Sequence, residues 1–241
     1  MVTDTTTNYS SPAGREFTIA AGRLAGINPA SRVLDMGCGY GEAACTLAQI
    51  FRCKVTAVDI SEDNIEQARQ EAKKRQVSHL IEFSCTDILT ADYSAEPFDL
   101  VLAEGGMFSF LSRTKGLACA SAWLMPRGWL AFSDLIITSK TCPDEITTVY
   151  SFNEFNYETE ETYRKLISNA GFDSQAQLIT LVPQSGWDNY YAHMARRLED
   201  EQGFFSDPKV KRAFHREIDV FYRLEAFKYI GYLFCATRKP D

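Results

Sequence analysis

The stretch VLDMGCGYGEAA, residues 33–44, is the most informative part of the sequence. A short apolar run ends in a turn with three glycines, Gly37, Gly39 and Gly41, and Asp35 stands just ahead of the first of them. A strand that ends in a glycine turn and leads into a helix brings backbone N–H groups and the helix N-terminus to a ligand at the carboxyl end of a sheet. The stretch therefore predicts a nucleotide-type site.

The residues around these glycines indicate which nucleotide fits. A dinucleotide-binding fingerprint needs its third glycine where this chain has Glu42, and Asp35 would repel a pyrophosphate. A P-loop is excluded because no Lys followed by Ser or Thr comes after Gly41. The loop favours a ligand without phosphates that carries a positive amino group near Asp35 and a ribose further along. An NAD(P)-dependent oxidoreductase is the disfavoured alternative from the same fold.

Two further acids follow the next two apolar runs. Asp59 ends the second expected strand, where a carboxylate can accept hydrogen bonds from both ribose hydroxyls. Asp87 follows the third strand and can accept from an adenine amino group, with Ile60 and Ile88 flanking the ring. Acids at three successive strand ends indicate a binding site more strongly than any one of them does alone.

Short apolar runs alternate with helix-forming stretches along the chain, which is typical of parallel strands connected by helices. The expected strands are residues 32–36, 54–60, 80–85, 98–104, 128–135, 174–182 and 229–238. The expected helices are near residues 41–50, 62–76, 112–123 and 158–169. The pattern predicts one α/β domain over residues 1–241 with seven strands.

A helical insertion over residues 186–227 is expected between the last two strands. WDNYYAHMARRLEDEQ and KVKRAFHREIDVFYRLEAF read as two amphipathic helices broken at GFFSDP. A connection this long is usually functional, and we expect it to form, together with the N-terminal segment, a roof over the acceptor pocket that determines substrate choice. The alternative is a homodimer surface that uses VFYRLEAF as an apolar stripe.

Five segments together resemble the motifs of class I S-adenosylmethionine-dependent methyltransferases. They are VLDMGCGYG, AVDIS, CTDIL, FDLVLAEGG and LMPRGWLAFSD, between about residues 30 and 135. The resemblance implies a Rossmann-like seven-stranded sheet, mostly parallel with an antiparallel last strand and helices on both faces. It also implies that S-adenosylmethionine is the cofactor, and it assigns cofactor contacts to Asp35, Gly37, Gly39, Asp59 and Asp87.

A narrower resemblance connects the chain with bacterial small-molecule methyltransferases of the ubiquinone/menaquinone type. It rests on SSPAGREFT, AEGGMFSF and YIGYLFCATRK. That group is poorly defined in substrate, so this resemblance names none. We expect a cofactor-binding core over residues 30–140, preceded by an N-terminal lid segment over residues 1–29. In that segment, Tyr9 and Arg15 are expected to fold over the cofactor and pair with its carboxylate.

The chemistry is expected beside the fourth strand. Glu104 ends that strand next to Gly105 and Gly106, which let a substrate approach the backbone closely, and it is the first candidate to face the transferred methyl group. Tyr190 and His193 in the insertion supply an aromatic wall and a titratable group. We expect methyl transfer to oxygen, nitrogen or carbon of a small molecule. A cofactor-binding protein without turnover is the alternative.

Composition limits the partners and the compartment. The net charge of −7 and the pI of about 5.1 argue against nucleic acid, and AEGGMF replaces the tetrapeptide typical of DNA amino methylases. No apolar stretch approaches the ~20 residues of a membrane span, and no export signal is recognisable, so a cytoplasmic protein is expected. The seven cysteines lack metal-ligand spacing and are expected to be free thiols without a metal site.

Overall fold

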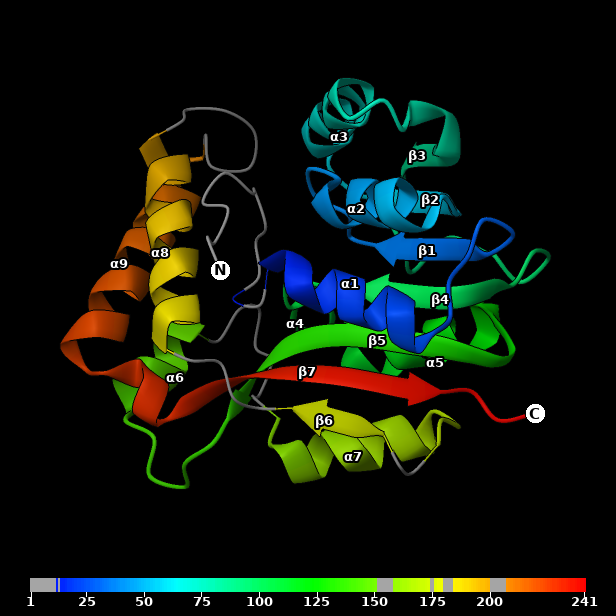
Figure 1. Ribbon diagram of the computed structural model, residues 1–241. Helices are drawn as coiled ribbons and strands as arrows, with labels where there is room; N and C mark the ends of the chain where they lie inside the picture. Colours follow the sequence, from blue (N-terminus) through cyan, green and yellow to red (C-terminus); the bar gives the residue numbers. More distant parts are fainter. Residues whose placement is uncertain (1–11, 13, 151–157, 174–175, 180–183, 200–206) are drawn as a thin grey trace.

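A seven-stranded sheet is the scaffold of the protein. The computed structural model describes residues 12, 14–150, 158–173, 176–179, 184–199 and 207–241 (Figure 1). The strand order is β3-β2-β1-β4-β5-β7-β6, and β7 runs antiparallel to both of its neighbours. The strands are β1 (Arg32–Met36), β2 (Lys54–Asp59), β3 (Ile81–Cys85), β4 (Phe98–Ala103), β5 (Leu124–Ile137), β6 (Gln177–Ile179) and β7 (Ile230–Arg238). The expected sheet, with its antiparallel last strand, is confirmed.

Helices cover both faces of this sheet. In Figure 1, α1, α2 and α3 lie on one face, and α4, α5 and α7 lie on the other. The α-helices are α1 (Gly14–Leu24), α2 (Glu42–Phe51), α3 (Glu62–Lys74), α4 (Met107–Phe110), α5 (Arg113–Trp123), α6 (Asp144–Tyr150), α7 (Glu160–Asn169), α8 (Gln184–Glu199) and α9 (Pro208–Arg223). Short 3₁₀ turns are formed by η1 (Ser78–Leu80) and η3 (Ala226–Lys228). This arrangement is the Rossmann-like architecture that the sequence predicts.

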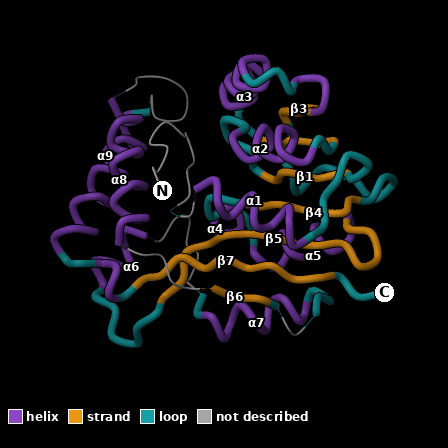
Figure 2. Tube along the Cα trace, viewed as in Figure 1, coloured by secondary structure: helices purple, strands orange, loops and turns teal. Residues whose placement is uncertain are grey.

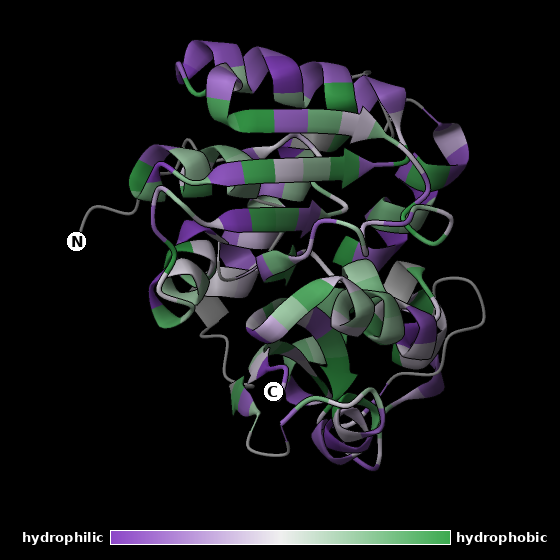
Figure 3. Cartoon of the chain, turned by 90° about the vertical axis from the view of Figure 1, so that its right-hand side faces the viewer, coloured by the Kyte–Doolittle hydropathy of each residue, from purple (hydrophilic) through white to green (hydrophobic). Residues whose placement is uncertain are grey.

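Two buried clusters hold the helices to the sheet. Leu47 of α2 and Ile65 of α3 are buried on one face, while Leu117 of α5 and Tyr163 of α7 are buried on the other. The α3 helix, at the top of Figures 1 and 3, is mostly hydrophilic, because only one stripe of it is buried. Burial of apolar surface on both faces makes the sheet a rigid platform for the residues at its carboxyl edge.

The expected helical insertion is confirmed, and it forms a layer of its own. Figure 2 shows α6, α8 and α9 beyond the carboxyl ends of the parallel strands, with α8 on the side toward the sheet. A third buried cluster joins this layer to β7 through Trp187, Tyr191, Phe221 and Tyr232. The indole of Trp187 meets the Tyr232 ring edge-on, with 5.9 Å between the ring centroids. The insertion is therefore packed against the sheet edge where the site is expected.

The structure differs from the expected elements at β5 and at the N-terminus. The fifth strand was expected to begin at residue 128, but Leu124 already pairs with Phe98, and a register shift in the pairing with β4 follows. Arg127 has a positive φ of 65°, so the irregularity is accommodated inside the strand. The α1 helix was not expected, because its pattern gives no strong cap and it is stabilised by packing on α2. In the residues described, no helix has the length and apolarity to span a bilayer.

Candidate active site

The glycine loop connects β1 to α2 in a tight turn over β2. The N–H groups of Gly37 and Cys38 both donate to the carbonyl of Val58, at 2.8 and 2.9 Å. Gly41 begins α2 with a φ of 76°, and a Cβ there would lie 2.8 Å from the Cβ of Ala68, so only glycine fits. A Cβ at Gly39 would meet nothing within 4 Å. The loop therefore leaves open space beside Gly39, as a bound ligand requires.

Asp59 fixes the loop from the end of β2. Its Oδ2 accepts from the N–H of Gly39 at 2.8 Å, and its Oδ1 accepts from the N–H of Ser61 and from Nδ2 of Asn64, both at 3.0 Å. A carboxylate has about four lone-pair sites, so these bonds leave acceptor capacity. Asp59 therefore sits beside the open space at Gly39, where the sequence predicts the ribose.

Asp35 is a buried acid without a full set of partners. Only 1% of its surface is exposed, and its Oδ2 has no hydrogen-bond partner among the residues that the structure describes. Burial raises the pKa of Asp35 to about 7, although a bond from the N–H of Ala44 lowers that pKa, and the charge of Asp59 raises it further. A buried carboxylate with an unpaired oxygen is stabilised by a positive ligand group, which agrees with the predicted role.

Glu104 is a second acid with a raised pKa. It follows β4, the neighbour of β1, and its Oε1 accepts from the hydroxyl of Thr18 on α1. Loss of hydration raises the pKa of Glu104 to about 8; the Thr18 hydrogen bond lowers that pKa, and the negative charge of Asp35 raises it. The negative charges of Asp35 and Glu104 therefore repel each other in the folded protein, and a cation bound beside them would reduce this repulsion.

Because the pKa values of these two acids are raised, we expect the stability of the ligand-free protein to depend on pH. The folded state raises the pKa of Asp35 from 3.8 to about 7 and that of Glu104 from 4.5 to about 8, so it binds more protons than the unfolded chain in that interval. We expect the free energy of unfolding to fall as pH rises from about 5 to 8, as urea titrations would measure. Asp35→Asn should flatten this slope and Asp99→Asn should not; an equal slope in Asp35→Asn would contradict the assignment.

The predicted adenine contacts lie in different environments. Asp87 accepts from the N–H of Leu89 at 2.9 Å, which closes a turn after β3. Ile60 is 74% exposed and free to cover a ring, whereas Ile88 is only 4% exposed and belongs to the core under α5 and α7. Ile60 thus offers more accessible surface to a ligand than Ile88 does.

The predicted N-terminal contacts are only partly described. Tyr9 lies outside the described residues. Arg15 lies in the first turn of α1, one turn before Thr18, and within the described ranges its buried Nε has no hydrogen-bond partner. An unpaired buried donor of this kind suits an anionic ligand group, as the sequence predicts.

A buried polar cluster under the fourth and fifth strands was not expected. Asp134 of β5 accepts from Nε of Arg113 at 3.1 Å and from the hydroxyl of Tyr163. A Cβ at Gly106 would lie 3.5 Å from Oδ1 of Asp134 and 4.0 Å from the hydroxyl of Tyr232. The side chains of Asp134 and Tyr232 therefore lie directly beside Gly106. No local pattern marks them, because they come from separate elements and meet only in the folded chain.

His193 and Tyr190 both lie on α8, and no contact of the described residues joins them to Glu104. His193 is 8% exposed, and its buried Nε2 has no hydrogen-bond partner in the described part of the chain. Burial, with a smaller effect of Arg196, lowers the pKa of His193. Tyr190 is partly buried between α8 and α9, and burial raises its pKa. Neutral His193 can accept a proton, and Tyr190 supplies an aromatic surface.

The buried core of this layer contains another acid. Glu217 of α9 is 3% exposed and accepts from the hydroxyl of Tyr191 at 3.0 Å, and the hydroxyls of Tyr191 and Tyr150 lie 2.7 Å apart. Burial raises the pKa of Glu217 to about 7, while the bond from Tyr191 lowers it. Nothing in the local pattern distinguishes this acid from the other charges on an amphipathic helix.

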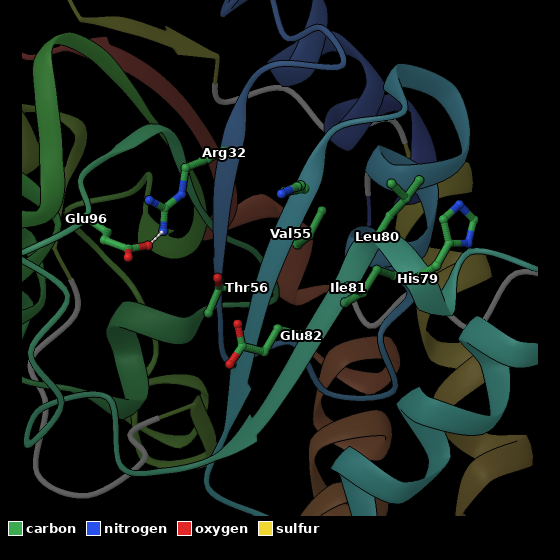
Figure 4. A pocket seen from close by; sticks show the side chains of 9 residues that line it. Arg32, Val55, Thr56, His79, Leu80, Ile81, Glu82 and Glu96 are labelled. Carbon is green, nitrogen blue, oxygen red and sulfur yellow. Dashed lines mark ion pairs between the residues drawn. The ribbon is translucent and has the colours of Figure 1, made fainter.

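A hollow of about 410 Å³ lies at the opposite edge of the sheet (Figure 4). Arg32, Lys54 and Ile81, at the amino ends of β1, β2 and β3, line it. Arg32 and Glu96 form an ion pair of 2.6 Å at one side. Ligands of open α/β sheets bind outside the carboxyl ends, so this hollow is separate from the candidate site.

The strand order, the glycine loop and the acids at the carboxyl ends of β1, β2 and β4 are those of the class I methyltransferase fold. A methyltransferase-domain family model matches residues 33–128. A sarcosine/dimethylglycine N-methyltransferase from Halorhodospira halochloris is 31% identical over 181 residues, 73% of this chain; the chain spans 63% of that relative's length. Residues 33–128 therefore match a methyltransferase domain, and the resemblance to class I S-adenosylmethionine-dependent methyltransferases is confirmed.

Solved structures share this fold across nearly the whole chain. A methyltransferase from Thiobacillus denitrificans in complex with S-adenosylhomocysteine has a TM-score of 0.75 at 19% identity, covering 97% of this chain and 95% of that one. The [4+2]-cyclase SpnF has a TM-score of 0.76 at 20% identity, covering 94% and 80%. Since a cyclase has the same fold, the activity of this chain must be argued from its site.

Proposed function

We propose that this protein transfers a methyl group from S-adenosylmethionine to oxygen, nitrogen or carbon of a small molecule. The observation that carries the proposal is the pair of acids, Asp35 and Glu104, beside the open glycine loop. S-adenosylmethionine has a positive amino group and a positive sulfonium, and it has no phosphate. The unpaired Oδ2 of Asp35 and the space at Gly39 fit such a ligand.

Each part of S-adenosylmethionine is assigned to particular residues of the chain. In the proposal, Asp59 accepts from the ribose hydroxyls and Asp87 from the adenine amino group, with Ile60 and Ile88 beside the ring. Asp35 faces the amino group, the backbone at Gly37 and Gly39 borders the cofactor, and Arg15 and Tyr9 pair with its carboxylate. The bound cofactor supplies a methyl group already activated by the sulfonium.

Glu104 is the proposed base of the reaction. It follows β4, and its raised pKa of about 8 suits proton transfer near neutral pH. Alignment of the acceptor and exclusion of water supply the rest of the rate enhancement. Tyr190 and His193 line the roof formed by α8 and α9, which selects the acceptor.

The competing functions differ in the ligand they require. An oxidoreductase must bind NAD(P)H, but Glu42 is buried and ion-paired with Arg75 at the position of the third fingerprint glycine. Calorimetry with S-adenosylhomocysteine and NADH separates the two: we expect binding of the first and not of the second. Binding of NADH alone would overturn the proposal. A binding protein without turnover would bind S-adenosylhomocysteine yet give no methylated product with metabolite extracts.

The setting of the protein is also part of the proposal. The net charge of −7 supports a small-molecule partner rather than nucleic acid. We place the protein in the cytoplasm, where its seven free cysteines stay reduced. The outer face of α9 is the candidate surface for a homodimer.

The roof can be tested by two substitutions. Tyr190→Ala and His193→Ala should each leave the affinity for S-adenosylhomocysteine nearly unchanged but lower turnover at least ~10-fold, about 1.4 kcal/mol of lost transition-state stabilisation. Calorimetry and product formation are the measurements, and melting curves monitor folding. Tyr222→Ala, at a residue 48% exposed on α9, is the control. Full turnover in both roof variants would remove this role.

A further inference from the structure

The α1 helix is fixed between the two halves of the sheet. Gly22 packs on α2 so closely that a Cβ there would lie 2.4 Å from the ring of Phe51. Toward the other end of the helix, the ring of Phe17 packs on Phe234 of β7, with 5.1 Å between the centroids. These two contacts hold α1 on both sides and so determine where the side chains between them point.

Thr18 stands between these anchor points and reaches the site. It is completely buried, and its hydroxyl donates to Oε1 of Glu104, 86 residues further along the chain. In the part of the chain that the structure describes, Oε2 of Glu104 has no hydrogen-bond partner. The two carboxylate oxygens are therefore not equivalent, because one is held by α1 and the other is left for a ligand.

We propose that Thr18 is a positioning residue for Glu104, holding Oε1 so that Oε2 faces the methyl acceptor. The proposal rests on the proposed function, since it gives Oε2 the acceptor proton: the acceptor loses the proton as it forms its bond to the methyl carbon, and the sulfonium becomes a neutral thioether. Thr18 touches neither acceptor nor cofactor. It acts through Glu104 by fixing the carboxylate and by stabilising its charged form.

The hydrogen bond from Thr18 has a measurable consequence. A donor to a carboxylate favours the charged form, and this bond lowers the pKa of Glu104 against the opposing effects of burial and of Asp35 on β1. Thr18→Val removes the donor while keeping the shape of the side chain. We expect the titration midpoint of Glu104 to rise by about one pH unit or more, a tenfold gain in proton affinity.

The midpoint can be measured by carbon-13 NMR of labelled glutamate carboxyls, with the Glu104 signal assigned from its loss in Glu104→Gln. Thr18→Ser keeps the hydroxyl and should titrate close to the wild type. Thr237→Val is the matched control, because Thr237 is 2% exposed and donates to the carbonyl of Asp173, which follows α7. It should cost stability without moving the midpoint. If Thr18→Val does not fold, Thr18→Ala gives the same readout.

The outcomes separate this inference from the proposed function. A rise in Thr18→Val or Thr18→Ala, with recovery in Thr18→Ser, supports the positioning role. An unchanged midpoint in a folded variant without the hydroxyl overturns it, even if S-adenosylhomocysteine still binds the wild type. Failure of S-adenosylhomocysteine to bind the wild type overturns the proposed function instead, whatever the midpoints are.

Discussion

Asp59→Ala should weaken the binding of S-adenosylhomocysteine by about 10- to 150-fold, or roughly 1.5 to 3 kcal/mol. Two losses add in this variant. The ribose loses a charged acceptor, and the loop loses the carboxylate that holds the N–H of Gly39 and the side chain of Asn64. Isothermal calorimetry at fixed pH measures the change.

A matched carboxylate controls for general damage. Asp99 also stands in a strand and accepts from a backbone N–H, that of Arg32 at 2.8 Å, but Arg32 begins β1 at the amino edge of the sheet. Asp99→Ala should therefore lower stability without weakening the ligand. Wild-type affinity in folded Asp59→Ala would remove Asp59 from the cofactor site.

Glu104→Gln should lower turnover at least ~100-fold, because loss of a general base typically costs two to four orders of magnitude. The affinity for S-adenosylhomocysteine should change by less than about threefold, since an amide keeps the shape of the side chain and this ligand carries no sulfonium. In the wild type, kcat/KM should rise with pH through the pKa of Glu104, about 8 in the free protein, because the base must be deprotonated.

Both halves of this prediction can fail separately. Glu82→Gln, an exposed position on β3, is the control and should keep full turnover. Wild-type turnover in Glu104→Gln would show that Glu104 is not the base, and that alignment of the acceptor with the methyl group accounts for catalysis. A large loss of S-adenosylhomocysteine affinity would instead make Glu104 a cofactor ligand.

The parts of the site that could be predicted from sequence are those set by local pattern. Asp35 and Asp59 stand at the ends of short apolar runs, and the parallel sheet brings such ends to one edge. The glycines around Cys38 marked the turn itself. Strand ends, turn residues and acids at fixed offsets are all visible within a few dozen residues.

The contacts that could not be predicted join distant elements. Thr18 and Glu104 meet across 86 residues, and Tyr191 and Glu217 meet only because α8 packs on α9. Asp134 looked like an ordinary strand end, although Arg113 and Tyr163 enclose it. Such pairings depend on how helices pack on the sheet, and a single sequence does not encode them in any short pattern.

The direction of β7 has a consequence for how this molecule can vary. Because β7 runs antiparallel to β6, the chain leaves β6 and enters β7 at the same edge, so α8 and α9 form a closed excursion with neighbouring ends. We therefore expect that α8 and α9 can be exchanged together between related methyltransferases without moving the glycine loop or its acids, provided that Tyr232 still finds an aromatic partner where Trp187 now lies.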